Sequence, residues 1–180
     1  MKKVIVMFLM ACMLFSAAGC SVPNDTDSLF KPTEAVFSID NYHLQITADS
    51  TFQEKTGGNY DLQITNGSTY ISIMAYKYMD LPENVTPLDV YDMQNEDLFS
   101  KRTAVTVIEE AKTQSLSQRT ITHALYSAEK DGVKNYYASY LIDLPDAETF
   151  AWVLVTAMPS YLSDNRDLLH DIVCSLTTIE

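Results

Sequence analysis

Cysteine is scarce in this chain, and the usual catalytic signatures are missing. The 180 residues include three cysteines, at positions 12, 20 and 174. The sequence has no G-x-S-x-G, H-E-x-x-H, C-x-x-C, Walker or G-x-G-x-x-G motif, and no EF-hand loop. It also lacks internal repeats and low-complexity segments. These absences leave no local signal for an enzyme active site, and a hydrolase with an unfamiliar site stays only a minor alternative.

Basic residues are the second shortage. The chain has 12 Lys and Arg against 24 Asp and Glu, a net charge of −12. Such a chain is a poor nucleic-acid binder and is repelled by anionic lipid headgroups. Solubility is the ordinary explanation for the acidic excess. A role with divalent cations is the alternative.

The first twenty residues read as a lipoprotein export signal. Lys2 and Lys3 precede the apolar run 4–15, and small residues 16–19 lead to Cys20. The apolar run is too short for a membrane-spanning helix. The site resembles a lipobox, although Ala17 stands where leucine is common. We therefore expect cleavage after residue 19 and a diacylglyceryl thioether on Cys20, with acyl chains such as palmitate.

An ordinary secretory signal with an incidental cysteine is the alternative for this segment. In either case the leader removes Lys2 and Lys3, which leaves 10 basic and 24 acidic residues, a net charge of −14. Cys174 then has no partner for an intrachain disulfide. An unpaired cysteine on an apolar helix is usually a small buried hydrophobe, whereas a reactive thiol is the less common case.

We expect three segments along the chain. Residues 1–19 form the signal peptide, and 20–33, which are rich in Pro, Asn, Asp and Ser, form a lipidated tether. Residues 34–180 are long enough for one domain with a buried core.

Alternating apolar residues predict several strands. The expected strands cover 42–47, 60–65, 69–78, 120–129, 133–143 and the continuous apolar run 150–158, which suits a strand buried on both faces. Asn66-Gly67 and Asp131-Gly132 predict hairpins, with a type I′ turn at the first. Residues 105–115 fit a strand, although Glu109 to Lys112 would also suit a helix.

Two helices complete the prediction. The first begins at Thr86-Pro87, where threonine caps, proline takes the first helical position and Asp89 complements the helix dipole, and it ends near Ser100 or Lys101. The second runs from about Ser163 to Leu176, capped by Ser163 or Asp164. Its core stripe is Leu169, Ile172, Val173 and Leu176. Together these elements predict an α+β domain with an antiparallel sheet flanked by helices.

The order of elements resembles the PsbP-like/DcrB-like superfamily, in a branch of lipoproteins common in Gram-positive bacteria. The resemblance covers residues 33–180. It depends on the extended pair 37–39 and 42–52, the helix entered at Thr86-Pro87, the hairpin 125–134, and the segment 150–160 that leads into a helix ending at 172–176.

The resemblance implies a PsbP-like α/β/α sandwich. It also implies a mostly non-enzymatic role as an extrinsic subunit, assembly factor or adaptor. No catalytic residues carry over, because the superfamily has no shared catalytic set.

Tyrosine provides the candidate partner surface. Several of the eleven tyrosines lie in expected strands, and Tyr76, Tyr78, Tyr136 and Tyr140 share parity along their strands. We expect these four to form a partner-binding face, with ordinary strand packing as the alternative. Trp152 is expected in the core.

Metal sites find only weak support. Asp143, Asp146 and Glu148 surround a proline loop and are weak calcium candidates, with solvated loop charges as the alternative. His170 and Cys174 share a helix face, but a zinc site would need further ligands. His43 and His123 lie at unrelated positions.

These observations predict a lipid-anchored, non-catalytic domain outside a bacterial cytoplasmic membrane. We expect it to act as an adaptor or accessory subunit of an envelope complex, with an envelope protein as partner and no cofactor. A lipoprotein that binds a cation or small ligand through its acidic loops is the alternative.

Overall fold

The computed structural model describes residues 33–116 and 118–179; the predicted signal, Cys20 and most of the predicted tether lie outside them. The elements in chain order are β1 (Glu34–Ile39), η1 (Asp40–Tyr42), β2 (Leu44–Asp49), β3 (Gln53–Glu54), β4 (Leu62–Thr65), β5 (Thr69–Lys77), η2 (Tyr78–Asp80), α2 (Pro87–Ser100), β6 (Thr103–Leu116), β7 (Arg119–Lys130), β8 (Val133–Leu144), η3 (Pro145–Ala147), β9 (Thr149–Ala157), α3 (Pro159–Asp164), α4 (Arg166–Cys174) and β10 (Thr177–Thr178).

A seven-stranded sheet forms the centre of the domain. Its order is β3-β4-β5-β9-β8-β7-β6, and each neighbouring pair is antiparallel. The continuous apolar run becomes β9, the middle strand, which is buried along almost its whole length. A strand in this position is covered on both faces, so it has no solvent side to show alternation.

A second, three-stranded sheet joins the two ends of the domain. Strand β2 pairs with β1 on one side and with the short β10 on the other, in the order β1-β2-β10. The extended pair near residues 37–52 was predicted, and the β1–β2 pairing confirms it. Neither β10 nor a separate sheet was predicted from the sequence.

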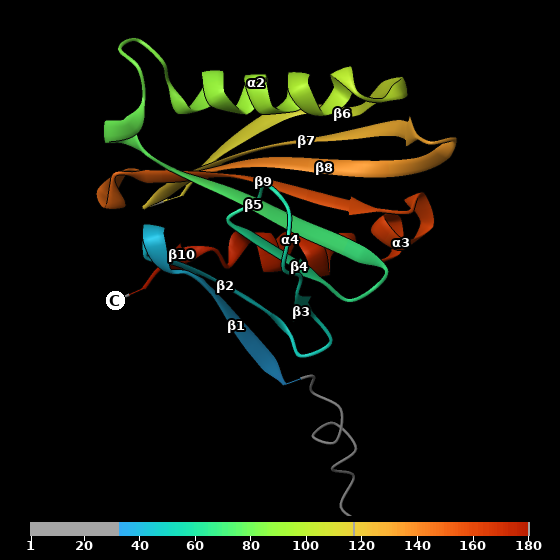
Figure 1. The fold of residues 1–180 in the computed structure, drawn as a ribbon, viewed down its shortest axis with the longest axis horizontal. Helices are drawn as coiled ribbons and strands as arrows, with labels where there is room; N and C mark the ends of the chain where they lie inside the picture. The colour runs from blue at the N-terminus through green and yellow to red at the C-terminus, as the bar shows by residue number, and fades with distance from the viewer. Residues whose placement is uncertain (1–32, 117, 180) are drawn as a thin grey trace, which may run out of the picture. The chain divides into compact units, whose positions relative to one another are not determined.

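Helices cover the large sheet unequally. Figure 1 shows α2 alone on one face, while α3, α4 and the three-stranded sheet lie on the other. The domain is therefore an antiparallel, sheet-dominated α+β fold with both faces of its main sheet buried. The predicted α/β/α sandwich is correct only in this coarser form, because half of one outer layer is itself a sheet.

Local chemistry explains where α2 begins. Thr86 accepts a hydrogen bond from the Asp89 amide, Asp89 accepts one from the Thr86 amide, and Pro87 occupies the first turn. This reciprocal capping box satisfies amides that a helix leaves unpaired. The helix ends at Ser100, as predicted. No helix within residues 33–116 and 118–179 is long and apolar enough to span a membrane.

The last helix differs from its prediction. Two helices stand in its place, α3 and α4, with Asn165 between them. The Asn165 side chain donates to the Tyr161 carbonyl at 2.9 Å, while its own carbonyl accepts from the Leu169 amide at 2.9 Å. The cap predicted at Ser163 or Asp164 is therefore wrong, whereas the buried stripe, Leu169, Ile172, Val173 and Leu176, is confirmed.

The two hairpin turns behave differently. At Asp131-Gly132 both residues have positive φ (53° and 77°), as a type I′ turn requires. At Asn66-Gly67 only the glycine does. There the Asn66 side chain accepts from the amides of Ser68 and Thr69, both at 3.1 Å, and holds a longer loop. The hairpin is confirmed, but its predicted type I′ turn is wrong.

Strand β6 forms one edge of the large sheet. Residues 105–115 are a strand rather than a helix, and nearly every residue of β6 is exposed. Three register irregularities interrupt its pairing with β7, between Thr103 and Lys112. Such bulges bend an edge strand and weaken its ability to pair with another chain.

Candidate functional site

The four candidate tyrosines do not share a face. Tyr76 of β5 is directly opposite Phe150 of β9, and Phe150 is directly opposite Asp143 of β8. Opposite residues point to the same face, so Asp143 lies on the Tyr76 side of the sheet. Every second residue of β8, at positions 141, 139 and 137, lies on that side as well. Tyr136 and Tyr140 therefore lie on the opposite side. The prediction of one tyrosine surface is wrong, because equal parity in two strands means a common face only when the register allows it.

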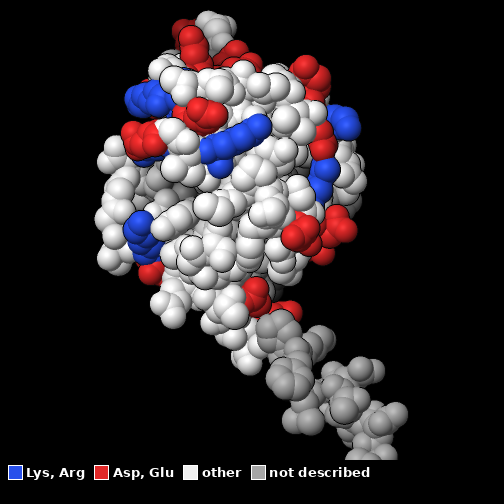
Figure 2. Space-filling view, turned by 90° about the vertical axis from the view of Figure 1, so that its right-hand side faces the viewer, with Lys and Arg blue, Asp and Glu red and all other residues white. Residues whose placement is uncertain are grey.

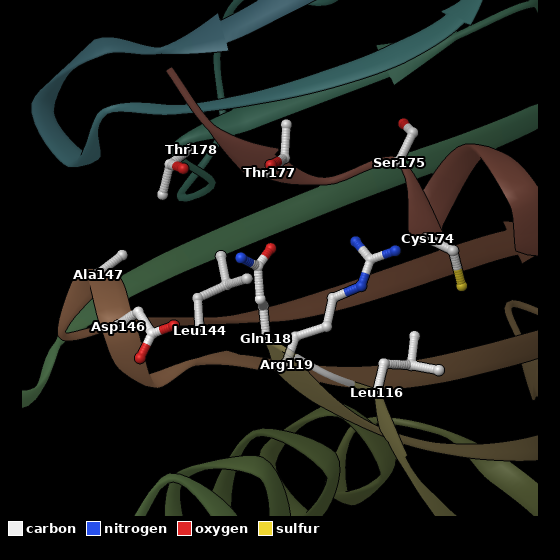
Figure 3. A pocket seen from close by; sticks show the side chains of 10 residues that line it. All are labelled: Leu116, Gln118, Arg119, Leu144, Asp146, Ala147, Cys174, Ser175, Thr177 and Thr178. Carbon is white, nitrogen blue, oxygen red and sulfur yellow. The ribbon is translucent and has the colours of Figure 1, made fainter. Parts of the chain in front are cut away.

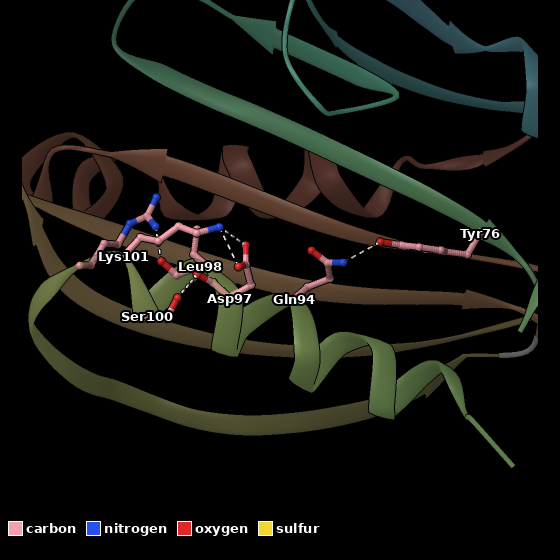
Figure 4. Close-up of polar contacts among 7 residues, drawn as sticks. Tyr76, Gln94, Asp97, Leu98, Ser100 and Lys101 are labelled. Atoms are coloured by element: carbon pink, nitrogen blue, oxygen red, sulfur yellow. Dashed lines mark hydrogen bonds and ion pairs between the residues drawn. The ribbon is translucent and has the colours of Figure 1, made fainter. Parts of the chain in front are cut away.

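Each of these tyrosines is also engaged within the domain. Tyr76 stacks on Phe150 with ring centroids 5.0 Å apart, and its hydroxyl accepts from Gln94 Nε2 at 3.0 Å (Figure 4). Burial raises the pKa of Tyr76 to about 12. Tyr140 is only 5% exposed, and Tyr136 packs against the same core cluster. These rings stabilise the fold rather than form an open patch.

The acidic loop does not gather its carboxylates into a site. Asp143 accepts a hydrogen bond from the Tyr78 hydroxyl, and burial together with this bond raises the Tyr78 pKa. Glu148 lies just after η3 in a left-handed conformation, and Asp146 is exposed. Within residues 33–116 and 118–179 no group of three or more His, Cys, Asp or Glu side chains could hold a metal ion. The weak calcium prediction is therefore not supported by the geometry.

A buried polar network under α2 was not predicted. Asn95 Oδ1 accepts from Ser139 Oγ at 2.6 Å and from Trp152 Nε1 at 3.3 Å, and the indole also reaches Ser139 Oγ at 3.0 Å. Trp152 is 2% exposed, as its predicted core position requires. The only signals of this network in the sequence were Asn95 and Ser139, two polar residues within apolar patterns. Their side-chain oxygens accept from the indole N–H of Trp152 and so satisfy it.

Two histidines that are distant in sequence lie together on the face of the large sheet that α4 covers, which we call the α4 face. His123 of β7 and His170 of α4 have ring centroids 5.8 Å apart, and Tyr140 lies 5.7 and 5.8 Å from them. Burial lowers the pKa of His123, and the charge of the nearby His170 lowers it further. Cys174 Sγ is 3.4 Å from His170 Nε2, which confirms their common helix face. Burial raises the Cys174 pKa and favours the neutral thiol.

A groove of about 820 Å³ lies at one end of the large sheet (Figure 3). Three segments that are distant in sequence form its walls: the β6–β7 turn, the β8–β9 connection and the chain after α4. The lining residues are Leu116, Gln118, Arg119, Leu144, Asp146, Ala147, Cys174, Ser175, Thr177 and Thr178. We refer to this cavity as the end groove. Its size is that of pockets that bind small ligands or peptide segments.

Arg119 and Asp146 are the charged residues that line the end groove. Arg119 Nη1 donates to the Leu176 carbonyl at 3.0 Å, which positions the guanidinium beside the end of α4. No carboxylate within residues 33–116 and 118–179 forms an ion pair with Arg119. The remaining polar side chains are the Gln118 amide, the hydroxyls of Ser175, Thr177 and Thr178, and the Cys174 thiol. This groove was not predicted from the sequence, because its walls come together only through the sheet topology.

Charge on another surface is dispersed. Figure 2 shows the end of the domain that lies at the right in Figure 1. Lys and Arg alternate there with Asp and Glu around a largely uncharged centre, and neither sign forms a continuous patch. This face therefore carries no basic stripe of the kind that follows a nucleic-acid backbone.

Solved structures with this architecture were found, whereas no protein-family model and no curated protein sequence matches the chain. The cyanobacterial PsbP protein CyanoP from Synechocystis sp. PCC 6803 matches with a TM-score of 0.62 at 8% identity, over 83% of this chain and 95% of that chain. LpqN of Mycobacterium tuberculosis, involved in cell envelope biogenesis, matches with 0.57 at 11% identity, over 82% and 85%.

The Ran-binding protein Mog1p of Saccharomyces cerevisiae is a third similar structure. It matches with a TM-score of 0.55 at 10% identity, over 83% of this chain and 97% of that chain. Identities this low show a common fold and transfer no residue roles. The chain therefore has the fold that is shared by PsbP, Mog1 and LpqN, as the resemblance in its order of elements predicted.

Proposed function

We propose that this protein is a lipid-anchored domain on the outer face of a bacterial cytoplasmic membrane. It acts as a non-catalytic adaptor or accessory subunit of an envelope complex. The anchor is Cys20, the tether is residues 20–33, and the domain binds an envelope protein. The end groove is the observation on which this function chiefly depends, because it is a large cavity lined by apolar and polar groups that include one cation, Arg119, and one carboxylate, Asp146.

Similar structures support a binding role without fixing the partner. LpqN is described as involved in cell envelope biogenesis, and Mog1p is described as Ran-binding. Both functions belong to those proteins. They support the proposal, because the same fold occurs in a protein involved in cell envelope biogenesis and in a Ran-binding protein.

The chemistry of the candidate nucleophile also favours binding over catalysis. Cys174 lines the end groove, but burial raises its pKa and its neighbour His170 lies in the aromatic cluster with His123 and Tyr140. A thiolate is the reactive form of cysteine, and this environment disfavours it.

The test is photo-cross-linking in intact cells from two positions of the full-length protein. A photoreactive residue replaces Gln118 in the end groove or, as a control, Lys134 on the far β7–β8 hairpin. We expect one dominant membrane or cell-wall protein to be captured from position 118 and much less of it from position 134. Equal capture from both positions, or none from position 118, would contradict an adaptor that uses this groove.

The anchor is tested separately. Labelled palmitate should enter the full-length protein, and Cys20→Ala should abolish the label and release the domain from the membrane fraction. Retention of the label in Cys20→Ala would exclude this lipidation site. Cys174→Ala is the matched control, and it should change neither readout.

A small-ligand-binding lipoprotein is the second candidate function. The volume of the end groove, about 820 Å³, favours it because such cavities commonly enclose a drug-sized molecule. Native mass spectrometry of the full-length protein purified from its own cells distinguishes this candidate. A stoichiometric small molecule that is lost in Arg119→Gln would support it, whereas a bare protein that still cross-links its partner would favour the adaptor.

A further inference from the structure

We propose that the end groove binds an extended peptide segment of the partner protein, which adds as a strand to the free edge of β10. The inference deepens the proposed adaptor function and rests on it, because it names the chemistry of the partner at the same groove. The partner segment would carry an acidic side chain opposite Arg119.

The free edge of β10 faces away from β2. In the order β1-β2-β10, no strand within residues 33–116 and 118–179 pairs with the outer side of β10. The amide of Ile179 donates to the His43 carbonyl at 2.8 Å, and Thr178 is opposite Leu44. Successive residues of an antiparallel strand alternate in the direction of their peptide groups. Thr178 therefore directs its N–H and C=O outward, on the side of an unpaired strand edge.

This edge is held in place from behind. The Ser175 hydroxyl accepts from the Thr47 amide at 2.8 Å and lies 2.6 Å from the Ile172 carbonyl. The Ser175 side chain therefore adds a further contact between β2 and the chain after α4. Leu176, which follows, is fully buried. A fixed strand edge binds a peptide with less loss of conformational entropy than a mobile one.

The opposite wall of the groove supplies side-chain recognition. Figure 3 shows the Gln118 amide and the Arg119 guanidinium extending from the β6–β7 turn toward the wall formed by Ser175, Thr177 and Thr178. A glutamine amide both donates and accepts, which suits a peptide main chain. Arg119 uses one nitrogen for the Leu176 carbonyl, so its remaining donors suit a carboxylate.

The edge of β6 is longer than that of β10 but less suitable. Strand β6 has an unpaired outer edge and exposed Val105, Val107 and Ile108. However, its three register irregularities interrupt the regular spacing of peptide groups that an added strand needs. The end groove combines a strand edge with a second wall, and peptide-binding domains that add a strand use this combination of main-chain pairing and side-chain pockets.

The experiment compares two substitutions of Thr178 in the full-length protein purified in detergent. Peptides selected on the unmodified protein from a library of short random sequences displayed on phage serve as the probe. Thr178→Ala removes the side chain and keeps the outward N–H, whereas Thr178→Pro also removes the N–H, which no bond to β2 requires. We expect Thr178→Pro to weaken peptide binding about tenfold and Thr178→Ala by no more than about twofold.

Arg119→Gln provides the second readout. Selection on the unmodified protein should enrich Asp or Glu at one peptide position, and selection on Arg119→Gln should lose that enrichment. Equal effects of the two Thr178 variants, or selected peptides whose binding neither variant changes, would overturn strand addition. That result would leave the adaptor function standing if position 118 still cross-links a partner in cells. Failure of cross-linking with retained peptide binding would instead count against the adaptor.

Discussion

The two faces of the large sheet are covered in different ways. On one face a single helix, α2, closes over aromatic side chains and over a buried polar network. On the other, two separate covers lie side by side: α3 with α4, and the three-stranded sheet built from both ends of the domain. The end groove lies where this second cover meets the β6–β7 and β8–β9 turns.

The side-chain polar network lies on the α2 face, although Thr69, Ser127 and Thr149 are buried on the other face. Under α2 the polar side chains Asn95 and Ser139 are buried and bonded to one another. On the α4 face, His123, His170 and Cys174 are only partly buried, and Arg166 and Glu109 form an ion pair at 2.6 Å near the surface. The single helix α2 thus closes one face and stabilises the fold, whereas the two separate covers of the other face leave the end groove open for binding.

The largest expected effect tests whether the α2 face is sealed. Trp152→Ala should lower the free energy of unfolding by about 3–5 kcal/mol, because it opens a cavity and leaves Asn95 and Ser139 without the indole. Met158→Ala, at an exposed position nearby in sequence, should change it by about 0.5 kcal/mol or less. Urea unfolding of the purified variants measures both. A loss below about 1 kcal/mol for Trp152→Ala would contradict a tightly packed α2 face.

A smaller loss is expected at the centre of the polar network. Asn95→Ala removes the acceptor for Ser139 and should cost about 1–3 kcal/mol. Its Nδ2 has no partner within the described residues, so deleting it also relieves an unsatisfied donor and places the loss in the lower half of that range. Gln94→Ala, which loses one half-exposed bond to Tyr76, is the control for urea unfolding. Equal losses would mean that the network adds nothing beyond an ordinary surface bond.

The α4 face should depend less on its polar contacts. A double-mutant cycle of Glu109→Gln and Arg166→Gln should give a coupling of about 0.2–1 kcal/mol, since the two side chains are 24% and 50% exposed and solvent screens them. The pair Asp97–Lys101 on α2 is more exposed and should couple by about 0.3–0.5 kcal/mol. A coupling above about 2 kcal/mol for Glu109 and Arg166 would show that this ion pair stabilises the α4 face as much as the Asn95–Ser139–Trp152 network stabilises the α2 face.

The smallest expected effect is a pH dependence at His123. Burial and His170 lower its folded pKa, Arg166 and Lys112 act in the same direction, and Glu109 opposes them. The unfolded chain therefore takes up a proton more readily as the pH falls below about 6.5, and folding becomes less stable. His123→Gln should flatten this decline in urea unfolding between about pH 7.5 and 5.5, whereas Tyr140→Phe, which keeps the ring, should not. An unchanged slope in His123→Gln would assign the decline to other groups.

Elements with local signals were predictable from the sequence. The capping residues of α2, the Asp131-Gly132 turn and the apolar β9 each reflect interactions within a few residues of the chain. Local competition explains two errors. The Asn66 side chain accepts hydrogen bonds from two loop amides, and the loop forms in place of a type I′ turn. The apolar periodicity predicted one continuous final helix, but the helix is interrupted at Asn165, whose side chain bonds to the preceding turn.

Features that depend on register or topology were beyond the sequence analysis. Tyr76 and Tyr140 lie on opposite faces because of how β5, β9 and β8 align, and no pattern within one strand records that alignment. His123 and His170 meet because α4 packs over β7 and β8. The end groove depends on three segments, distant in sequence, that only the complete fold brings together.

The bond between Ser175 and Thr47 joins residues 128 positions apart in the chain. Strand β2 can therefore pair with β1 as soon as residues 34–49 are available, but it must wait for the last segment of the chain before β10 completes its second edge. Contacts of such long sequence separation form slowly, because closing the loop between them costs entropy before the contact is made. We expect a nascent chain to keep this hairpin open on one side until residues 175–178 have been synthesised, so that the three-stranded sheet is the last part of the domain to become native.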